Sequence, residues 1–178
     1  LFSSFAVGIE DNFSIGGGLV PLFLFAGAPT PVWITPKLSI PISREKLSLG
    51  AGGLLGTVIG EENAGYGILY GISTFGSKDK NLSLGLGYGY AGGEWAQTPM
   101  INLSGMVRMG PRGYFLTENY FIKTGNTTTT ILWLGGRQII KDWGLDYGLI
   151  IPIYSEMEEF IAIPWLGITI PFGGEVSN

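Results

Sequence analysis

The sequence predicts an all-β protein, a closed antiparallel β-barrel that spans a membrane. Three observations support this prediction. Only 13% of the residues are charged, whereas 46% are hydrophobic and 30 are glycine, and ordinary soluble domains carry about 25% charged residues. No apolar stretch is free of helix breakers over the roughly 20 residues that a membrane helix needs. Many segments instead alternate between apolar and small or polar residues with the period of two that is typical of strands.

The physical reason for a barrel is that the hydrocarbon core of a bilayer contains no water to bond to backbone groups. A spanning chain must therefore pair all of these groups, either within helices or in a sheet without edges. The best candidate for a membrane helix, residues 13–36, contains several glycines and prolines, including Gly17, Pro21 and Pro31. Helices are thus disfavoured. The chain, residues 1–178, is expected to form a single domain, because it is too short for two of ordinary size.

The clearest predicted strand covers residues 81–91. One of its faces is apolar and aromatic, and the other consists of small or polar residues. The first face carries Leu82, Leu84, Leu86, Tyr88 and Tyr90, and the second carries Asn81, Ser83, Gly85, Gly87, Gly89 and Ala91. Large apolar residues outside and small residues inside are typical of a narrow transmembrane barrel. We therefore expect the leucines and tyrosines of this segment to face lipid.

Eleven such segments follow one another, bounded by turn residues and mostly about 10 to 13 residues long, enough to cross a bilayer at a tilt of about 45°. They are residues 1–10, 13–25, 32–42, 47–59, 64–76, 81–91, 100–109, 113–122, 129–140, 145–154 and 160–172. Bacterial single-chain barrels have even strand numbers, so either one strand has been counted twice or one strand lies before Leu1. We expect a strand before Leu1, and about 12 strands in all.

The connections between these segments form two alternating sets. The short set is 11–12, 43–46, 77–80, 110–112 and 141–144, and the mostly longer set is 26–31, 60–63, 92–99, 123–128 and 155–159. The short set is mixed with a cationic excess, since it holds six Lys and Arg residues beside four Asp and Glu residues, whereas the long set holds six Glu residues and Lys123 as its lone cation. Short turns of such barrels are periplasmic and longer loops lie outside the cell. Length and charge therefore predict the same orientation.

Several stretches resemble a family of uncharacterised outer-membrane barrels from Bacteroidota-type bacteria. They are VGIEDNFSIGGG, VWITPKLSIPIS, LSLGAGGLLGTVIGEENAGYGILYG, NLSLGLGYGYAGGEW, INLSGMVRMGPRGYFLTENY and IAIPWLGITIPFG, and together they cover most of the chain. The resemblance implies a secreted precursor that begins upstream of Leu1 and a location in the bacterial outer membrane. It implies no activity, substrate or catalytic residue. Expected partners are outer-membrane lipid, the outer-membrane assembly machinery and other outer-membrane proteins.

The last predicted strand resembles the signal that the assembly machinery recognises. The residues that carry this resemblance are Gly167, Ile168, Ile170 and Phe172. The alternative interpretation is an ordinary amphipathic strand. We expect the signal, because the strand ends on the side that the connections assign to the periplasm.

The composition disfavours an enzyme. The chain has no His and no Cys, so Ser-His-Asp and Cys-His nucleophiles and the usual zinc ligands are excluded. A catalytic site made of a Ser-Lys pair or of two carboxylates stays an alternative, but the sequence singles out no such pair. The net charge of −4 disfavours nucleic-acid binding, which requires dense Lys and Arg. The groups Glu61-Glu62-Asn63 and Glu156-Met157-Glu158-Glu159 could bind Ca²⁺ or Mg²⁺ through oxygen ligands, but such groups are more often solvated loop charges. No cofactor or metal is predicted.

Five ionisable residues within the strands form the sharpest candidate site. Alternation places Lys37, Arg108 and Asp146 on the inward face. Glu118 and Arg137 lie in segments that do not alternate cleanly, and we place them inward because an ionised group that faces lipid costs about 2 to 4 kcal/mol for Arg at the midplane and less for Glu. We expect all five to form one salt-bridged layer. They are Lys37, Arg108, Glu118, Arg137 and Asp146. The layer is expected to close the lumen.

Two functions follow from such a layer. The first is a non-enzymatic structural or accessory barrel whose lumen is closed by side chains. The alternative is a narrow pore for small solutes or ions, in which the same charges act as a selectivity filter. A third class, a soluble ligand-binding barrel, would place large apolar residues inside and charges outside.

Overall fold

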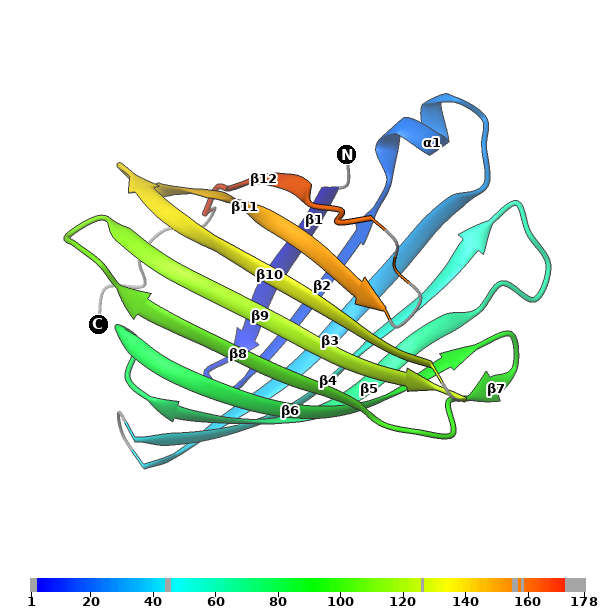
Figure 1. The fold of residues 1–178 in the computed structure, drawn as a ribbon. Helices are drawn as coiled ribbons and strands as arrows, with labels where there is room; N and C mark the ends of the chain where they lie inside the picture. Colours follow the sequence, from blue (N-terminus) through cyan, green and yellow to red (C-terminus); the bar gives the residue numbers. More distant parts are fainter. Residues whose placement is uncertain (1–2, 44–45, 126, 155–156, 158, 172–178) are drawn as a thin grey trace.

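The computed structural model describes residues 3–43, 46–125, 127–154, 157 and 159–171, and most of them belong to one sheet (Figure 1). Its strands are β1 (Ser3–Glu10), β2 (Phe13–Leu19), β3 (Thr30–Ser43), β4 (Leu47–Ile59), β5 (Tyr66–Gly76), β6 (Lys80–Ala91), β7 (Glu94–Trp95), β8 (Met100–Arg108), β9 (Gly113–Thr124), β10 (Thr127–Ile140), β11 (Trp143–Tyr154) and β12 (Ile163–Thr169). They form a 12-stranded antiparallel sheet in chain order, with β7 paired to β6 beside the main path. The predicted all-β, antiparallel fold is therefore confirmed.

The long strands follow the predicted segments. Each of the eleven segments overlaps one strand, with ends that differ by a few residues in most of them, and these strands follow one another in the sheet in chain order. The remaining strand, β7, consists of two residues inside the predicted loop 92–99. The sheet thus has twelve strands, of which β7 is a short hairpin arm. The strand expected before Leu1 stays a prediction.

The prediction of one strand over residues 13–25 is wrong in its second half. β2 ends at Leu19, and a short helix, α1, spans Pro21–Phe25. Proline suits the first turn of a helix, because its φ is already helical and it has no N–H to leave unpaired. α1 projects beyond the sheet (Figure 1) and leaves Phe25 86% exposed. No helix in the described residues has the length and apolar character to cross a membrane.

The connections lie at the two ends of the strands (Figure 1). The turns after β1, β3, β5, β8 and β10 are at one end, which we call the short-turn end. The longer connections, with α1 and β7, are at the other, which we call the long-loop end. This separation follows from consecutive antiparallel pairing, in which each strand returns the chain to the opposite end. The two sets of connections seen in the sequence therefore correspond to the two ends of the sheet.

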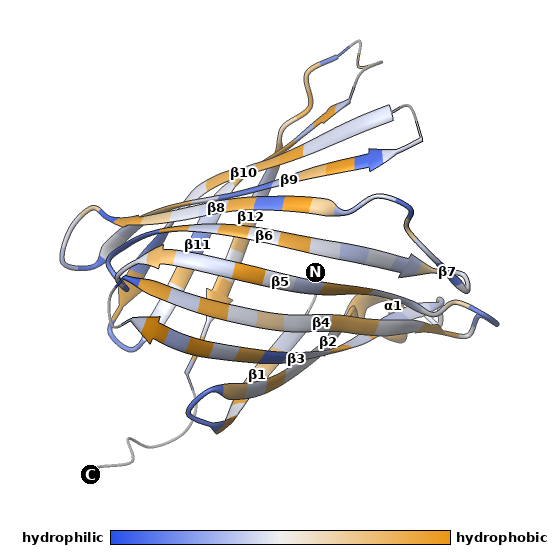
Figure 2. Cartoon of the chain, turned by 90° about the horizontal axis from the view of Figure 1, so that it is seen from below, coloured by the Kyte–Doolittle hydropathy of each residue, from blue (hydrophilic) through white to orange (hydrophobic). Residues whose placement is uncertain are grey.

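The two faces of the sheet differ in chemistry, and Figure 2 shows the alternation along the strands. On β6, Leu82, Leu84 and Leu86 are 53%, 51% and 53% exposed, whereas Ser83 and Gly85 between them are buried. We call the leucine side the outer face and the opposite side the inner face. Within the described residues no hydrophobic side chain is buried. The described part of the sheet therefore has no buried apolar core, and the exposed leucines of β6 lie on its outer face.

Glycines on the inner face leave room for aromatic side chains of the neighbouring strand. A Cβ on Gly52 of β4 would lie 2.6 Å from the hydroxyl of Tyr70, its partner on β5. Small residues opposite large ones allow side chains to fit inside a narrow, curved sheet. The glycine-rich strands thus determine where the inner aromatic rings can lie.

The two edge strands, β1 and β12, run in the same direction. Ten antiparallel pairings separate them in the sheet order, and each pairing reverses the strand direction. Among the described residues, ladder pairings join β1 only to β2 and β12 only to β11. The sheet nevertheless curls and brings these edges near each other. A cleft of about 730 Å³ shows this, because it is lined both by Ser3 and Ser4 of β1 and by residues 164–169 of β12.

Candidate functional site

A cavity of about 550 Å³ lies against the inner face and brings together four of the five ionisable residues singled out in the sequence. They are Lys37 of β3, Glu118 of β9, Arg137 of β10 and Asp146 of β11. The rest of the wall consists of the apolar and aromatic residues Ile72, Met106, Leu116, Trp133, Ile150 and Trp165, together with Asn81, Ser104, Gly105 and Thr117. The interior of the curled sheet is thus a hollow with a few charged groups on a mixed lining. Arg108 does not line this cavity.

Arg137 and Asp146 form a bidentate ion pair on one wall of the cavity. They are direct partners in the β10–β11 ladder. The Arg137 Nε donates to Asp146 Oδ1 at 2.6 Å, and Nη2 donates to Oδ2 at 2.8 Å. The Asp146 side chain is 15% exposed and that of Arg137 is 41% exposed. Such parallel bonds between a guanidinium and a carboxylate are strong and fix the geometry of both groups. Asp146 is therefore held by its partner, whereas Arg137 still reaches the open space.

Lys37 and Glu118 lie where the 550 Å³ cavity adjoins a second, smaller cavity. Both residues, with Ile72, also line a cavity of about 300 Å³. β3 and β9 are five pairings apart in the sheet order, so the two charges reach the hollow from different parts of its wall. Both side chains are exposed, and the ion pairs found among the described residues do not join them. The hollow therefore presents one ammonium and one carboxylate that do not neutralise each other by contact.

Polar and aromatic groups surround Glu118 in the smaller cavity. The Tyr120 hydroxyl donates a hydrogen bond to Glu118 Oε1. Tyr70 and Asn102 line the same space, beside the apolar side chains of Leu54, Ile68 and Met100. The Asn102 amide donates to the backbone oxygen of Asn119 at 3.3 Å. The smaller cavity is thus a mostly apolar compartment with a few polar groups on its wall and one acid at its boundary.

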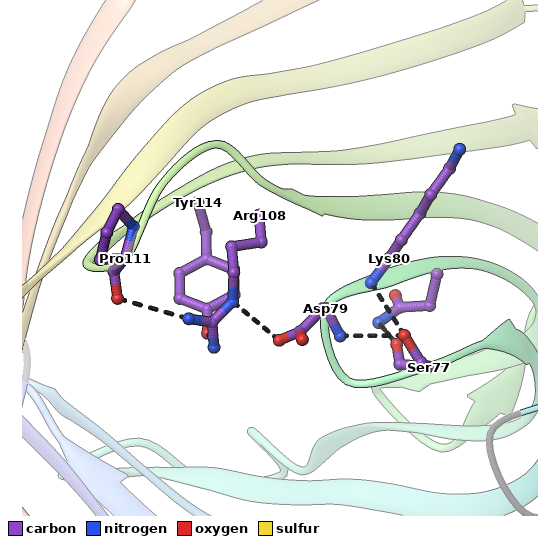
Figure 3. Close-up of polar contacts among 7 residues, drawn as sticks. Ser77, Asp79, Lys80, Arg108, Pro111 and Tyr114 are labelled. Atoms are coloured by element: carbon purple, nitrogen blue, oxygen red, sulfur yellow. Dashed lines mark hydrogen bonds and ion pairs between the residues drawn. The ribbon is translucent and has the colours of Figure 1, made fainter.

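Arg108 belongs to a separate cluster at the short-turn end (Figure 3). Its Nε donates to Asp79 Oδ1 at 2.8 Å, Nη1 donates to the Pro111 oxygen at 3.3 Å, and Nη2 donates to the Tyr114 hydroxyl. Its guanidinium also lies 4.8 Å from the centroid of the Tyr114 ring. Asp79 sits in the β5–β6 turn, where its N–H donates to Ser77 Oγ at 3.2 Å. Arg108 therefore ties the turn before β6 to the turn after β8, and the structure does not place it in one layer with the other four charges.

The aromatic residues that line the cavities were not part of the predicted charged layer. The sequence nevertheless contains a pattern that places them on the same face as the charges. Trp133 lies four residues before Arg137, and Tyr120 lies two residues after Glu118, so in a strand each shares a face with its charged neighbour. Once the charges are assigned to the interior, these rings follow. Asp79 carried no such signal, because it is in a turn and its contact with Arg108 depends on how two turns lie side by side.

The residues of the expected assembly signal are only partly described. Gly167 and Ile168 lie in β12, with Ile168 61% exposed on the outer face, and Ile170 follows the strand at 69% exposure. Phe172 lies outside the described residues. The structure thus shows an amphipathic edge strand at this position, which both the signal and the ordinary-strand interpretation require.

No metal centre is found in the part of the chain that the structure describes, since no three Asp or Glu side chains gather there into a group that could hold an ion. Of the acidic loop groups, Glu156 and Glu158 lie outside the described residues. Comparisons of the chain with protein-family models, with curated proteins and with solved structures find no match. The resemblance to outer-membrane barrels therefore stays a prediction, and the site is interpreted from its own chemistry.

Proposed function

We propose that this protein is an integral β-barrel of the bacterial outer membrane that forms a narrow pore for small solutes or ions. The outward apolar face supports the membrane location, because a surface of exposed Leu, Ile and Phe side chains is stable only against lipid or protein. The Glu-bearing long-loop end would face the outside of the cell and the short-turn end the periplasm. The chain would insert through the outer-membrane assembly machinery, with the end of β12 as its signal.

Closure of the barrel is part of the proposal. Because β1 and β12 run in the same direction, a direct pair between them would be parallel, whereas bacterial barrels close with antiparallel pairs and even strand numbers. One additional strand between β12 and β1 would pair antiparallel with both. It would give twelve full-length strands and leave no unpaired edge in the bilayer.

This closure predicts the outcome of cross-linking at the edge. A Cys at Phe5 of β1 should not form a disulfide with a Cys at Leu166 or Ile168 of β12, because an intervening strand separates their backbones by about 10 Å, beyond the roughly 7 Å that a disulfide allows. All three positions are on the outer face. The control pair, Cys at Leu84 and Leu103, which face each other on β6 and β8, should cross-link readily. Efficient cross-linking of β1 to β12 would show direct closure.

A single observation favours the pore over a closed accessory barrel. Lys37 and Glu118, the two charges between the inner cavities, are both exposed. A lumen closed by salt-bridged side chains would bury its charges in pairs, since an unpaired charge is costly away from water. Two exposed charges at the junction of two cavities are instead typical of a constriction that solutes can pass.

The pore predicts discrete conductance steps for the purified protein in planar bilayers with KCl. Glu118→Gln should make the pore less cation-selective and Lys37→Met more so, because each removes a charge from the constriction. Reversal potentials in a KCl gradient measure this selectivity. Glu62→Gln is the matched control, since Glu62 is exposed in a long connection and should change little. Folded protein that inserts but never conducts would favour the accessory barrel with a closed lumen.

A further inference from the structure

The junction between the two inner cavities has a pattern of charges that suits one class of solute, and this specificity rests on the pore proposed above. Lys37 and Glu118 carry opposite charges, both are exposed, and both line the two cavities. A simple ion of either sign is attracted by one of these groups and repelled by the other. A solute that carries both charges can satisfy both groups at once.

Neither group is neutralised by a partner of opposite charge. Among the described residues, the ion pairs are Arg108 with Asp79 and Arg137 with Asp146, and Glu118 accepts a hydrogen bond only from the uncharged Tyr120 hydroxyl. The second cation of the larger cavity, Arg137, is already held by Asp146 through two bonds. Lys37 and Glu118 are therefore the two charges of this cavity that no ion pair engages among the described residues.

The surroundings set the size and character of that solute. The smaller cavity measures about 300 Å³, and its wall combines Tyr70, Tyr120 and Asn102 with the apolar Leu54, Ile68 and Met100. The polar groups can bond to a charged head, and the apolar groups can contact a short aliphatic side chain. A zwitterion with one small apolar substituent matches both the few polar groups and the larger apolar part of this lining.

We infer that the pore favours zwitterionic solutes of amino-acid size, with Lys37 contacting the solute carboxylate and Glu118 contacting its ammonium group. The order of strands places the two groups on parts of the wall that are five pairings apart. The solute would cross the constriction with its dipole oriented between them, and its apolar side chain would lie in the smaller cavity against Ile68 and Met100.

Swelling of proteoliposomes tests this inference with L-valine and isovaleramide, two solutes of similar shape and no net charge, of which only valine is a zwitterion. Because an uncharged amide also crosses lipid directly, the rate into protein-free liposomes is subtracted for each solute. The remaining, pore-dependent rate should be higher for L-valine by roughly three- to ten-fold, the size of effect expected from two solvent-exposed charge contacts. Lys37→Met and Glu118→Gln should each reduce the preference. The exchange variant Lys37→Glu with Glu118→Lys keeps one charge of each sign and should retain it, which shows whether the charges or merely the pore size matter.

The outcomes separate this inference from the proposed function. Equal entry of the two solutes into wild-type proteoliposomes would overturn the zwitterion preference and leave the pore intact. A preference that survives in both single variants would also overturn it, because the assigned charges would then play no part. If neither solute enters faster than it enters protein-free liposomes and the reconstituted protein carries no current in KCl, the pore itself is rejected, and this inference with it.

Discussion

Replacing Asp146 with Ala is expected to lower the free energy of unfolding by about 2 to 3 kcal/mol. The substitution leaves the Arg137 guanidinium on the inner wall without the carboxylate that accepts two of its hydrogen bonds. Removing one partner of a buried ion pair costs about 3 to 5 kcal/mol, and the 41% exposure of Arg137 reduces this cost because water replaces part of the lost contact. Urea unfolding in detergent micelles or lipid vesicles, followed by tryptophan fluorescence, measures the change.

The matched control is Asp79→Ala in the other ion pair. Asp79 also pairs with an arginine, Arg108, at 2.8 Å, but its side chain is 46% exposed and that of Arg108 is 37% exposed. Exposed pairs contribute about 0 to 1 kcal/mol, so Asp79→Ala should destabilise the protein much less than Asp146→Ala. Equal losses in the two variants would mean that the Arg137–Asp146 pair is as solvated as the pair at the short-turn end.

Replacing Gly148 with Ala should lower the free energy of unfolding by about 3 kcal/mol, at the upper end of the cost of overpacking. Gly148 and Gly135 face each other in the β10–β11 ladder. A Cβ on Gly148 would lie 2.5 Å from the Leu134 oxygen and 2.9 Å from the Gly135 Cα. Both are backbone atoms of the neighbouring strand and cannot move without disturbing the ladder that also aligns Arg137 with Asp146. Urea unfolding under the same conditions measures the effect.

Gly105→Ala is the control for this substitution. A Cβ on Gly105 of β8 would have its nearest neighbour, the Asn81 oxygen, at 3.5 Å, which is ordinary van der Waals distance. The free energy of unfolding of the Gly105→Ala variant should change by no more than about 0.5 kcal/mol. It could also rise slightly, because Ala restricts the unfolded chain more than Gly does. Similar destabilisation at both glycines would indicate that loss of glycine flexibility, and not the close approach of β10 and β11, determines the result.

Much of the architecture could be predicted because alternation is a local property of the chain. In a strand, side chains at positions i and i+2 share a face whatever the rest of the molecule does, so the outward leucines of β6 follow from the sequence alone. Connection lengths likewise determine the order of strands and the ends at which they turn. The prediction of one strand over residues 13–25 was wrong because the apolar residues continue past Pro21. An apolar run by itself does not distinguish a strand from a short helix.

The sequence by itself determined the sheet, the division into two faces and the inward side of Lys37, Glu118, Arg137 and Asp146. Only the tertiary structure decided which of these charges meet. Alternation specifies the face of a residue, but it specifies neither its height along the tilted strands nor its distance around the wall, and both depend on the register of every intervening pair. That register aligns Arg137 with Asp146. It places Arg108 at the short-turn end, where it pairs with Asp79. Lys37 and Glu118 remain exposed where the two cavities join.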